Sequence, residues 1–367
     1  MKTIVIVGTY KGVLILRSKA KSGEWDAGNF LFKGWSVTCS ARDADGRYYL
    51  GVTHEVYGAT IILSDDLENW RQIDQGPAYD GQSKSNAGHM LLARQASNVR
   101  QVDQIWKLLC VGDRIYAGVS EAGLFFSDDR GESWQGVNGL NAYQGRDSWE
   151  AGFGGLCAHS LLFDANNTDR MWCGISAAGV FRTDDGGDTW QKKNDGVYSP
   201  SPGFCVHSIA HDPENAGLIY RQDHNGMYLS RNGGDNWSLI QDGLPMGSAQ
   251  DQPCVFGFNC EMDKKSNSVF VIPLEGDSYR FPHNGKLRVF RTRDEGESWQ
   301  ALSKGLPQQN AFANVLRGAM SVDNQDPCGV YFGTTSGTVY ASSDCGDNWN
   351  SLAHELPRIQ SVEAYPV

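Results

Sequence analysis

The sequence predicts an all-β fold, a seven-bladed β-propeller whose ring is closed by pairing of the N- and C-terminal strands. Three observations lead to this prediction. An octapeptide of the form Ser/Thr-x-Asp-x-Gly-x-x-Trp recurs seven times in complete or degenerate form, the chain between copies has room for four short strands, and the two chain ends supply complementary parts of one sheet. Internal repeats of this kind are typical of propellers. Residues 1–367 are therefore expected to form one propeller domain.

Five copies of the octapeptide are nearly complete, and two are degenerate. The nearly complete copies are Ser127–Trp134, Thr183–Trp190, Ser230–Trp237, Thr292–Trp299 and Ser342–Trp349. Asn232 replaces the aspartate in the third of these. The degenerate copies are Ser64–Trp70, which is one residue short and lacks the glycine, and Ser18–Trp25, which keeps the serine and the tryptophan. Seven copies predict seven blades, and a misread degenerate copy would change that number to six or eight.

The composition of the octapeptide is explained by a tight turn. A carboxylate at the third position can accept hydrogen bonds from neighbouring backbone N–H groups. Glycine two residues later permits a backbone conformation that other residues avoid, and the first hydroxyl adds a local hydrogen bond. The tryptophan then fills space between adjacent sheets. The motif is therefore interpreted as structural and not as a ligand site.

The strand order of one blade can be followed in the fourth unit. An inner strand within Leu156–Asp164 is followed by a second within Arg170–Ser176, a third beginning at Val180, and an outer strand that starts at Trp190. The chain opens with second- and third-type strands, TIVIVGT and GVLILRS, and no inner strand precedes them. The alternating tail IQSVEAYPV can supply that inner strand, which leaves no open sheet edge.

These octapeptides resemble the Asp-box, or BNR, repeats of sialidases, xyloglucan-active glycosidases, sortilin-type receptors and photosystem assembly factors. The resemblance covers essentially the whole chain and extends to bacterial BNR-repeat proteins described as sialidase-like or glycosyl-hydrolase-like. It implies a propeller with a carbohydrate-directed activity or a binding role. The chain departs from typical sialidases, because it lacks their N-terminal Phe/Tyr-Arg-Ile-Pro motif and has seven units where sialidases commonly have six blades.

Composition excludes several classes of partner. The formal net charge of −11 argues against nucleic acids and anionic membranes, which require a basic surface. No apolar segment approaches the ~18 residues of a membrane span. The nine cysteines are odd in number and form no CxxC pair, which favours free thiols in a reducing, cytoplasmic compartment. No cofactor is predicted.

The ligand site is expected at the top of the central channel, on the face opposite the octapeptide turns. Three long connections are predicted on this face, at Gly76–Asp103, Gly139–Gly155 and Pro273–Lys286, and the first is expected to carry a short helix around Asn86–Ala96. Loops on one face of a scaffold commonly carry the binding residues.

Departures from the repeat indicate candidate site residues, because the fold does not need them. The second strand of the fifth unit ends in Arg221, Asp223 and His224 where other units have small residues. His54 and Glu55 occupy the matching place in the second unit, and Glu121 does so in the third. Glu55, Glu121 and Asp223 are the predicted catalytic carboxyl groups, among further top-face acids at Asp147, Glu150, Glu275 and Asp277.

Two inner strands repeat the sequence Cys-x-His-Ser, which places His159 and His207 at equivalent positions of adjacent blades. Lys107 and Arg317 occupy comparable positions. Three interpretations of the histidine pair remain open: packing repeated between related blades, contact with a ligand at the channel mouth, or a metal site for which the sequence specifies no third ligand. Trp149 is predicted to contact ligand by stacking, as are Trp106 and Tyr10.

Two functions from different classes fit these features. The first is a glycoside hydrolase-like enzyme, which needs two carboxyl groups facing each other across a sugar. Its ligand would be a carbohydrate or another polar small molecule. The second is a non-catalytic binding or assembly scaffold, which would need a protein partner. A metal-dependent enzyme that uses His159 and His207 is a third alternative.

Overall fold

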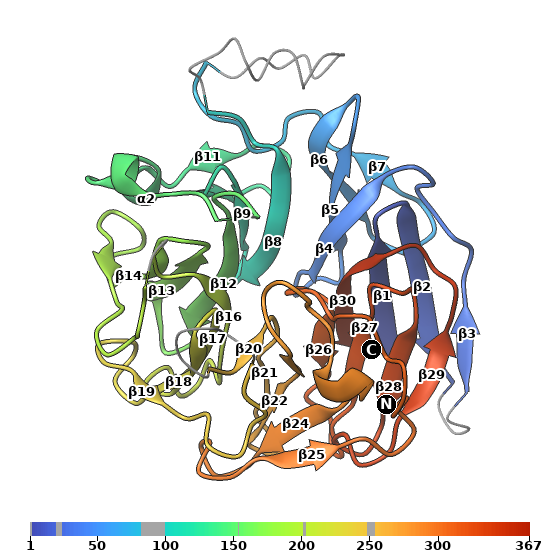
Figure 1. Ribbon diagram of the computed structural model, residues 1–367. Helices are drawn as coiled ribbons and strands as arrows, with labels where there is room; N and C mark the ends of the chain where they lie inside the picture. Colours follow the sequence, from blue (N-terminus) through green and yellow to red (C-terminus); the bar gives the residue numbers. More distant parts are fainter. Residues whose placement is uncertain (1, 20–23, 82–99, 153, 201–202, 248–253) are drawn as a thin grey trace.

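The computed structural model describes residues 2–19, 24–81, 100–152, 154–200, 203–247 and 254–367. Seven four-stranded antiparallel sheets surround a central channel, as Figure 1 shows, so the predicted all-β, seven-bladed β-propeller is confirmed. The helix expected around Asn86–Ala96 lies outside the described residues. No helix in the described ranges is long and apolar enough to cross a membrane.

The first four blades follow one pattern from the inner strand outward. Blade 1 contains β30 (Ile359–Pro366), β1 (Thr3–Thr9), β2 (Gly12–Ser18) and β3 (Trp25–Ala27). Blade 2 contains β4 (Ser36–Arg42), β5 (Tyr48–His54), β6 (Gly58–Ser64) and β7 (Arg71–Gln72). Blade 3 contains β8 (Gln104–Val111), β9 (Arg114–Ser120), β10 (Gly123–Ser127) and β11 (Gln135–Gly136). Blade 4 contains β12 (Ala158–Asp164), β13 (Asn167–Ile175), β14 (Gly179–Thr183) and β15 (Gln191–Lys192).

The remaining three blades keep the pattern with shorter strands. Blade 5 contains β16 (Val206–His211), β17 (Ile219–Asp223), β18 (Gly226–Ser230) and β19 (Ser238–Leu239). Blade 6 contains β21 (Glu261–Asp263), β22 (Ser268–Val271), β24 (Val289–Thr292) and β25 (Gln300–Leu302). Blade 7 contains β26 (Met320–Val322), β27 (Val330–Gly333), β28 (Val339–Ser342) and β29 (Asn350–Ala353).

The connections add a few further elements. β20 (Phe256–Gly257) and β23 (Pro273–Leu274) pair as a two-stranded sheet beside blade 6. The predicted long connection at Gly139–Gly155 includes the 3₁₀ helix η1 (Arg146–Ser148), and the short helix α2 (Asn138–Asn141) overlaps its start. The connection at Pro273–Lys286 carries β23 and the 3₁₀ helix η2 (His283–Gly285).

The C-terminal strand closes the ring, as the sequence predicts. β30 pairs antiparallel with β1 from Thr3 opposite Pro366 to Thr9 opposite Ile359. It is therefore the innermost strand of blade 1, whose other three strands are β1, β2 and β3 (Figure 1). Closure of this kind removes the open edge that a sheet would otherwise present.

The octapeptide of blade 4 forms the tight turn expected of it. The Thr183 hydroxyl donates to Asp185 Oδ1 at 2.7 Å and accepts from the Gly187 N–H at 2.9 Å. Asp185 Oδ1 also accepts the Thr189 N–H at 2.9 Å. Gly187 has a φ of +106°, a value that few other residues adopt, and its carbonyl accepts the Trp190 indole N–H at 3.0 Å. The aspartate oxygens are thus committed to the turn.

The hydrophobic core consists of clusters of side chains packed between neighbouring blades. Trp172 of β13 is fully buried between blades 4 and 5, where its indole N–H donates to the Gly233 carbonyl at 2.8 Å. Trp190 belongs to the cluster between blades 3 and 4. Bulky aromatics therefore fill the space between radial sheets, because a propeller packs one sheet face against the next. All nine cysteines are free thiols.

Candidate functional site

The central channel opens into a cavity of about 490 Å³. Inner strands from all seven blades line it, from Thr38 of β4 to Glu363 of β30. Tyr10, in the turn between β1 and β2, adds an aromatic ring that is 48% exposed. Pockets with this mixture of aromatic and polar groups are typical ligand sites. The channel position agrees with the predicted place of the site.

A β-bulge recurs near the start of five inner strands. The register shifts by one residue within β4, β8, β12, β16 and β30, which leaves one residue of each without a partner in the ladder. The five bulged residues all line the cavity: Thr38, Trp106, His159, His207 and Gln360. A bulge re-aims a side chain and is common beside functional sites. The repeated bulge therefore builds a ring of five polar or aromatic side chains around the channel.

His159 and His207 lie in this ring but hold different partners. The His207 Nδ1–H donates to the Gly257 carbonyl at 2.6 Å, and its Nε2 lies 3.6 Å from the thiol sulfur of Cys205. His159 uses Nε2 to donate to the Val206 carbonyl at 3.0 Å, while its Nδ1 lies 3.0 Å from the Ser160 hydroxyl. Burial lowers the pKa of His159 to about 3 and that of His207 well below its usual value. Both imidazoles are therefore neutral at pH 7.

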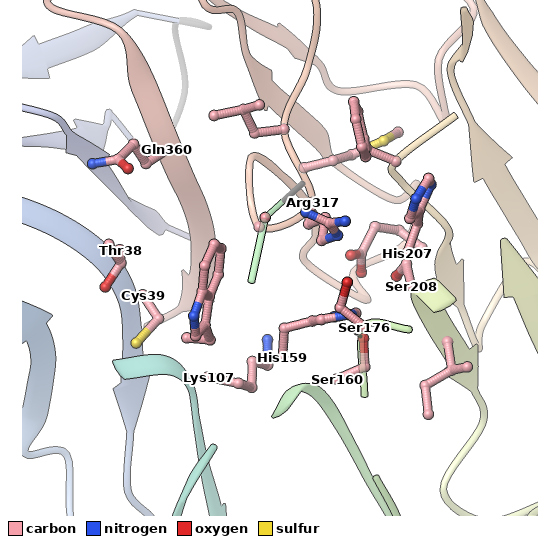
Figure 2. A pocket seen from close by; sticks show the side chains of 18 of the residues that line it. Thr38, Cys39, Lys107, His159, Ser160, Ser176, His207, Ser208, Arg317 and Gln360 are labelled. Atoms are coloured by element: carbon pink, nitrogen blue, oxygen red, sulfur yellow. Dashed lines mark hydrogen bonds between the residues drawn. The ribbon is translucent and has the colours of Figure 1, made fainter. Parts of the chain in front are cut away.

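Arg317 is the cation among these groups. Figure 2 shows its side chain projecting into the cavity between His207 and the strand that carries Gln360. The guanidinium lies over the Phe258 ring, 5.1 Å from the centroid. After burial, its charge is the second cause of the lowered pKa of both His159 and His207. Within the described residues no ion pair with a carboxylate is formed by Arg317, so its charge faces the cavity.

A lysine and two glutamates also line the cavity. Lys107 Nζ and Glu363 Oε1 form an ion pair at 3.0 Å, with 32% and 20% of their side chains exposed. Glu363 is the first cause of the raised pKa of Lys107. Burial raises the pKa of Glu261 to about 8, and the charge of Glu363 adds to this shift while Lys107 opposes it. At neutral pH Glu261 is therefore a protonated carboxyl group, in the same cavity as the Lys107–Glu363 ion pair.

Glu261 and Glu363 were not among the candidates expected from the sequence. Both lie on inner strands, Glu261 at the start of β21 and Glu363 in β30. The available signal was a charged residue on an inner strand, because the fold itself does not need it there. The carboxyl groups predicted from the sequence belong to top-face loops or to the end of β17, whereas this pair comes from inner strands.

The predicted carboxyl groups in loops lie outside the cavity. Glu55 is 79% exposed and its carboxylate lies 3.7 Å from Lys11 Nζ. Glu121 is exposed in the β9–β10 turn, where its backbone carbonyl accepts the Tyr79 hydroxyl at 2.8 Å. Neither side chain lines the central cavity. The structure therefore does not bring these two carboxyl groups together.

Arg221 and Asp223 are wholly buried and paired with each other. The Arg221 Nε–H donates to Asp223 Oδ2 at 3.0 Å, and its Nη1 donates to Asn194 Oδ1 at 2.7 Å. Burial raises the pKa of Asp223, and the charge of Arg221 opposes that shift. Neither residue lines the cavity, so of this predicted group His224 alone does. The pair instead supports the end of β17, from which His224 follows.

Two of the predicted ligand-binding residues, Trp149 and His54, pack against other aromatic rings instead of lining the cavity. Trp149 is 7% exposed and packs against Tyr143 and Phe181, at centroid distances of 5.8 and 5.1 Å. His54 lies between the rings of Trp35 and Tyr57, 4.9 Å from each. Both lie away from the central cavity. Trp106 does line it, and its indole N–H donates to the Ser120 hydroxyl at 2.7 Å.

A second cavity, of about 630 Å³, adjoins the first. It is lined by the loop that contains Glu275, Asp277 and Tyr279, and it shares His224 and Phe256 with the central cavity. Burial lowers the pKa of His224, and the charge of Asp277 opposes that shift. His224 thus stands between two cavities as a largely neutral imidazole.

No family model matches this chain. Among curated proteins it is similar to the oligoxyloglucan-reducing end-specific xyloglucanase of Emericella nidulans, with 24% identity over 247 residues, which are 65% of this chain and 24% of that protein. The chain therefore spans about a quarter of this relative.

Solved structures with similar folds include an enzyme and a peptide-bound protein. The GH74 xyloglucanase from Xanthomonas campestris matches with a TM-score of 0.62 and 17% identity, over 98% of this chain and 52% of that chain. YCF48 bound to D1 peptide matches with a TM-score of 0.50 and 12% identity, over 87% of this chain and 86% of that chain. At these identities the likenesses show the propeller fold.

Proposed function

We propose that this chain is a carbohydrate-directed enzyme of the glycoside hydrolase type, which acts in the central cavity with Glu261 and Glu363 as its carboxyl pair. The observation that carries the proposal is the presence in one cavity of a carboxyl group with a raised pKa, Glu261, and a second carboxyl group that pairs with a lysine, Glu363. Glu261 keeps its proton because burial raises its pKa to about 8, and Glu363 is the anionic partner of Lys107. Glycoside hydrolysis requires one carboxylic acid and one carboxylate.

The roles follow from the chemistry of the bond that is cleaved. Glu261 would donate its proton to the glycosidic oxygen as the sugar leaves, and Glu363 would attack the anomeric carbon or activate a water molecule there. Lys107 holds the Glu363 carboxylate in place through its ion pair at 3.0 Å. The substrate would thus be cleaved by acid–base catalysis between β21 and β30.

The remaining lining of the cavity is suited to a sugar. Trp106, Tyr10 and Phe258 offer aromatic surfaces, and Thr38 and Gln360 offer a hydroxyl and an amide to sugar hydroxyl groups. Similarity to the Emericella nidulans xyloglucanase supports testing xyloglucan oligosaccharides first. The predicted carboxyl groups Glu55, Glu121 and Asp223 are not assigned a role in this proposal, because they do not line the cavity.

The test is glycan turnover by the full chain, measured as released reducing ends against xyloglucan oligosaccharides and a panel of other glycans. Glu261→Gln and Glu363→Gln should each lower kcat by about 100-fold or more, since general acid–base groups contribute at least that much. Glu297→Gln, an exposed residue of an octapeptide turn, is the matched control and should retain full activity. Cleavage of no glycan, or equal activity in all three variants, would rule out the proposal.

A binding scaffold is the second candidate, and exposed aromatic side chains near the second cavity favour it. Tyr279 and Phe312 are 60% and 64% exposed, and Phe281 contacts both rings, at 5.6 and 5.3 Å. YCF48, a similar propeller, has been solved with a bound peptide. A scaffold would bind a protein partner through this aromatic cluster without turning over glycans, and Tyr279→Ser with Phe312→Ser would abolish that binding.

A further inference from the structure

Three side chains with metal-binding atoms meet where the two cavities adjoin. Cys205 precedes β16, His207 is the bulged residue of β16, and His224 follows β17. One ligand atom from each, the thiol sulfur and a ring nitrogen of each histidine, lies within 4.8 Å of the other two. The His224 N–H donates to the Cys205 carbonyl at 2.9 Å, so a backbone hydrogen bond fixes the two segments together.

The orientation of His207 suits a ligand. Its Nδ1–H donates to the Gly257 carbonyl at 2.6 Å, which leaves the lone pair of Nε2 directed toward Cys205, 3.6 Å from the sulfur. Metal-binding histidines almost always hold the other ring nitrogen in such a hydrogen bond.

We propose that Cys205, His207 and His224 form a binding site for a divalent transition-metal ion, with Zn²⁺ as the ion that fits best. Thiolate and imidazole ligands select Zn²⁺ over Mg²⁺ and Ca²⁺, which prefer oxygen. Three protein ligands leave a fourth tetrahedral position, as in catalytic zinc sites. All three residues line the central cavity, so that position is open to a ligand there.

The charges around the site determine what occupies the fourth position. Binding would release the thiol proton of Cys205, so Zn²⁺ with one thiolate adds a single positive charge. Arg317 lines the same cavity, so a second positive charge stands nearby. Two adjacent positive charges favour an anion, such as hydroxide or a ligand carboxylate, as the fourth ligand. Asp277, 3.8 Å from His224 Nε2, offsets part of the charge.

The adjacent blade provides a natural comparison. Cys157 and His159 repeat the Cys-x-His-Ser sequence in β12, but both nitrogens of His159 have hydrogen-bond partners, Val206 and Ser160. Among the described residues, Cys205, His207 and His224 form the metal-binding group, and Cys157 and His159 are not part of it. The same repeated sequence therefore contributes to the proposed metal site in blade 5 but not in blade 4.

The test is metal binding by the full chain after chelator treatment. Co²⁺ at pH 7.5 should bind once per chain and produce thiolate-to-cobalt charge-transfer absorption in the near ultraviolet, which an equimolar amount of Zn²⁺ removes. Cys205→Ser should abolish this absorption, and His207→Gln and His224→Gln should each weaken Zn²⁺ binding at least 10-fold in calorimetry. Cys157→Ser is the matched control and should keep the wild-type spectrum and affinity.

A second measurement avoids any folding defect of the variants. In the wild-type protein, Zn²⁺ should slow alkylation of Cys205 at least 10-fold while leaving Cys110, the other half-buried thiol, unchanged. Unchanged alkylation of Cys205, or loss of the cobalt spectrum in Cys157→Ser as well, would overturn the metal site. None of these readouts involves a glycan, so the metal site and the proposed hydrolase stand or fall separately.

Discussion

His159 and His207 occupy the same bulged position of adjacent inner strands, yet they donate from opposite ring nitrogens. His159 donates from Nε2 to the Val206 carbonyl, and His207 donates from Nδ1 to the Gly257 carbonyl. The other ring nitrogen of His159 lies beside a serine hydroxyl, whereas that of His207 lies beside a thiol. A single repeated motif thus yields one histidine that faces a hydroxyl and one that faces a metal-binding sulfur.

Glu261 should make stability depend on pH. Its folded pKa of about 8 lies above the usual value for a glutamate, so the folded state binds a proton that the unfolded state releases. Its contribution is fully present below pH 4 and is lost as pH rises through about 8, with a slope of at most about 1.4 kcal/mol per pH unit. Glu261→Gln should remove this slope in urea unfolding between pH 5 and pH 9. Identical slopes in both proteins would contradict the raised pKa.

Arg317 should control the protonation of the channel histidines. Its charge lowers the pKa of His159 and His207 beyond the effect of burial. Arg317→Gln should therefore raise both pKa values by a measurable amount, although burial should still hold them below the usual value. NMR titration of the imidazole protons measures this shift. His211 serves as the internal reference, because Arg317 is not among the causes of its lowered pKa.

Asp223 should be needed for stability. Asp223→Ala would leave Arg221 buried and without its carboxylate, and breaking a buried ion pair from one side costs about 3–5 kcal/mol. Chemical denaturation at pH 7 measures the loss. Glu295→Ala, which breaks the exposed pair with Arg231, should cost less than about 1 kcal/mol. Comparable losses in the two variants would show that the buried pair is not specially important.

The octapeptide turns should tolerate asparagine but not alanine. Asn232 already makes two of the hydrogen bonds that an aspartate makes in this turn, accepting from the Ser230 hydroxyl and the Asn236 N–H at 2.9 Å each. Asp185→Asn should therefore be nearly neutral at pH 7, and Asp185→Ala should cost about 1 kcal/mol.

The Thr189 hydroxyl is the first cause that lowers the pKa of Asp185 to about 2. Wild-type stability from this group is present above pH 4 and lost as pH falls through 2, and Asp185→Asn should lack that loss in acid unfolding.

The fold could be predicted because its signals are local and repeated. The octapeptide fixes one turn per blade, and the missing inner strand at the start of the chain pointed to the tail at its end. The structure confirms both the seven blades and the closure by β30. Blade 6 departs from the repeat, because β20 and β23 interrupt its strand pattern with a separate pair.

The site was predicted in part. Lys107, His159, His207, His224 and Arg317 do line the cavity. Arg221 and Asp223 were misplaced, because sequence alone does not show whether a polar strand end faces the channel or a neighbouring blade. The bulges have a similar effect, because one extra residue reverses the alternation of side chains. Beyond a bulge, an alternating pattern therefore assigns each side chain to the wrong face of the sheet. Thr38 and Gln360 are also bulged residues, but their local sequences share no motif, so nothing in the sequence marked them as cavity-lining residues.

The closure of the ring also imposes an order on synthesis. β1 is synthesised before the other six blades, but the strand that covers its inner edge is made only after them. Pairing over such a separation is slow, because the loop must close before any contact rewards it. Gln360 and Glu363 arrive with that final strand, so the cavity lacks two of its lining residues until the ring closes. Until β30 pairs with β1, the nascent chain therefore leaves the inner edge of β1 unpaired and has not yet assembled its site.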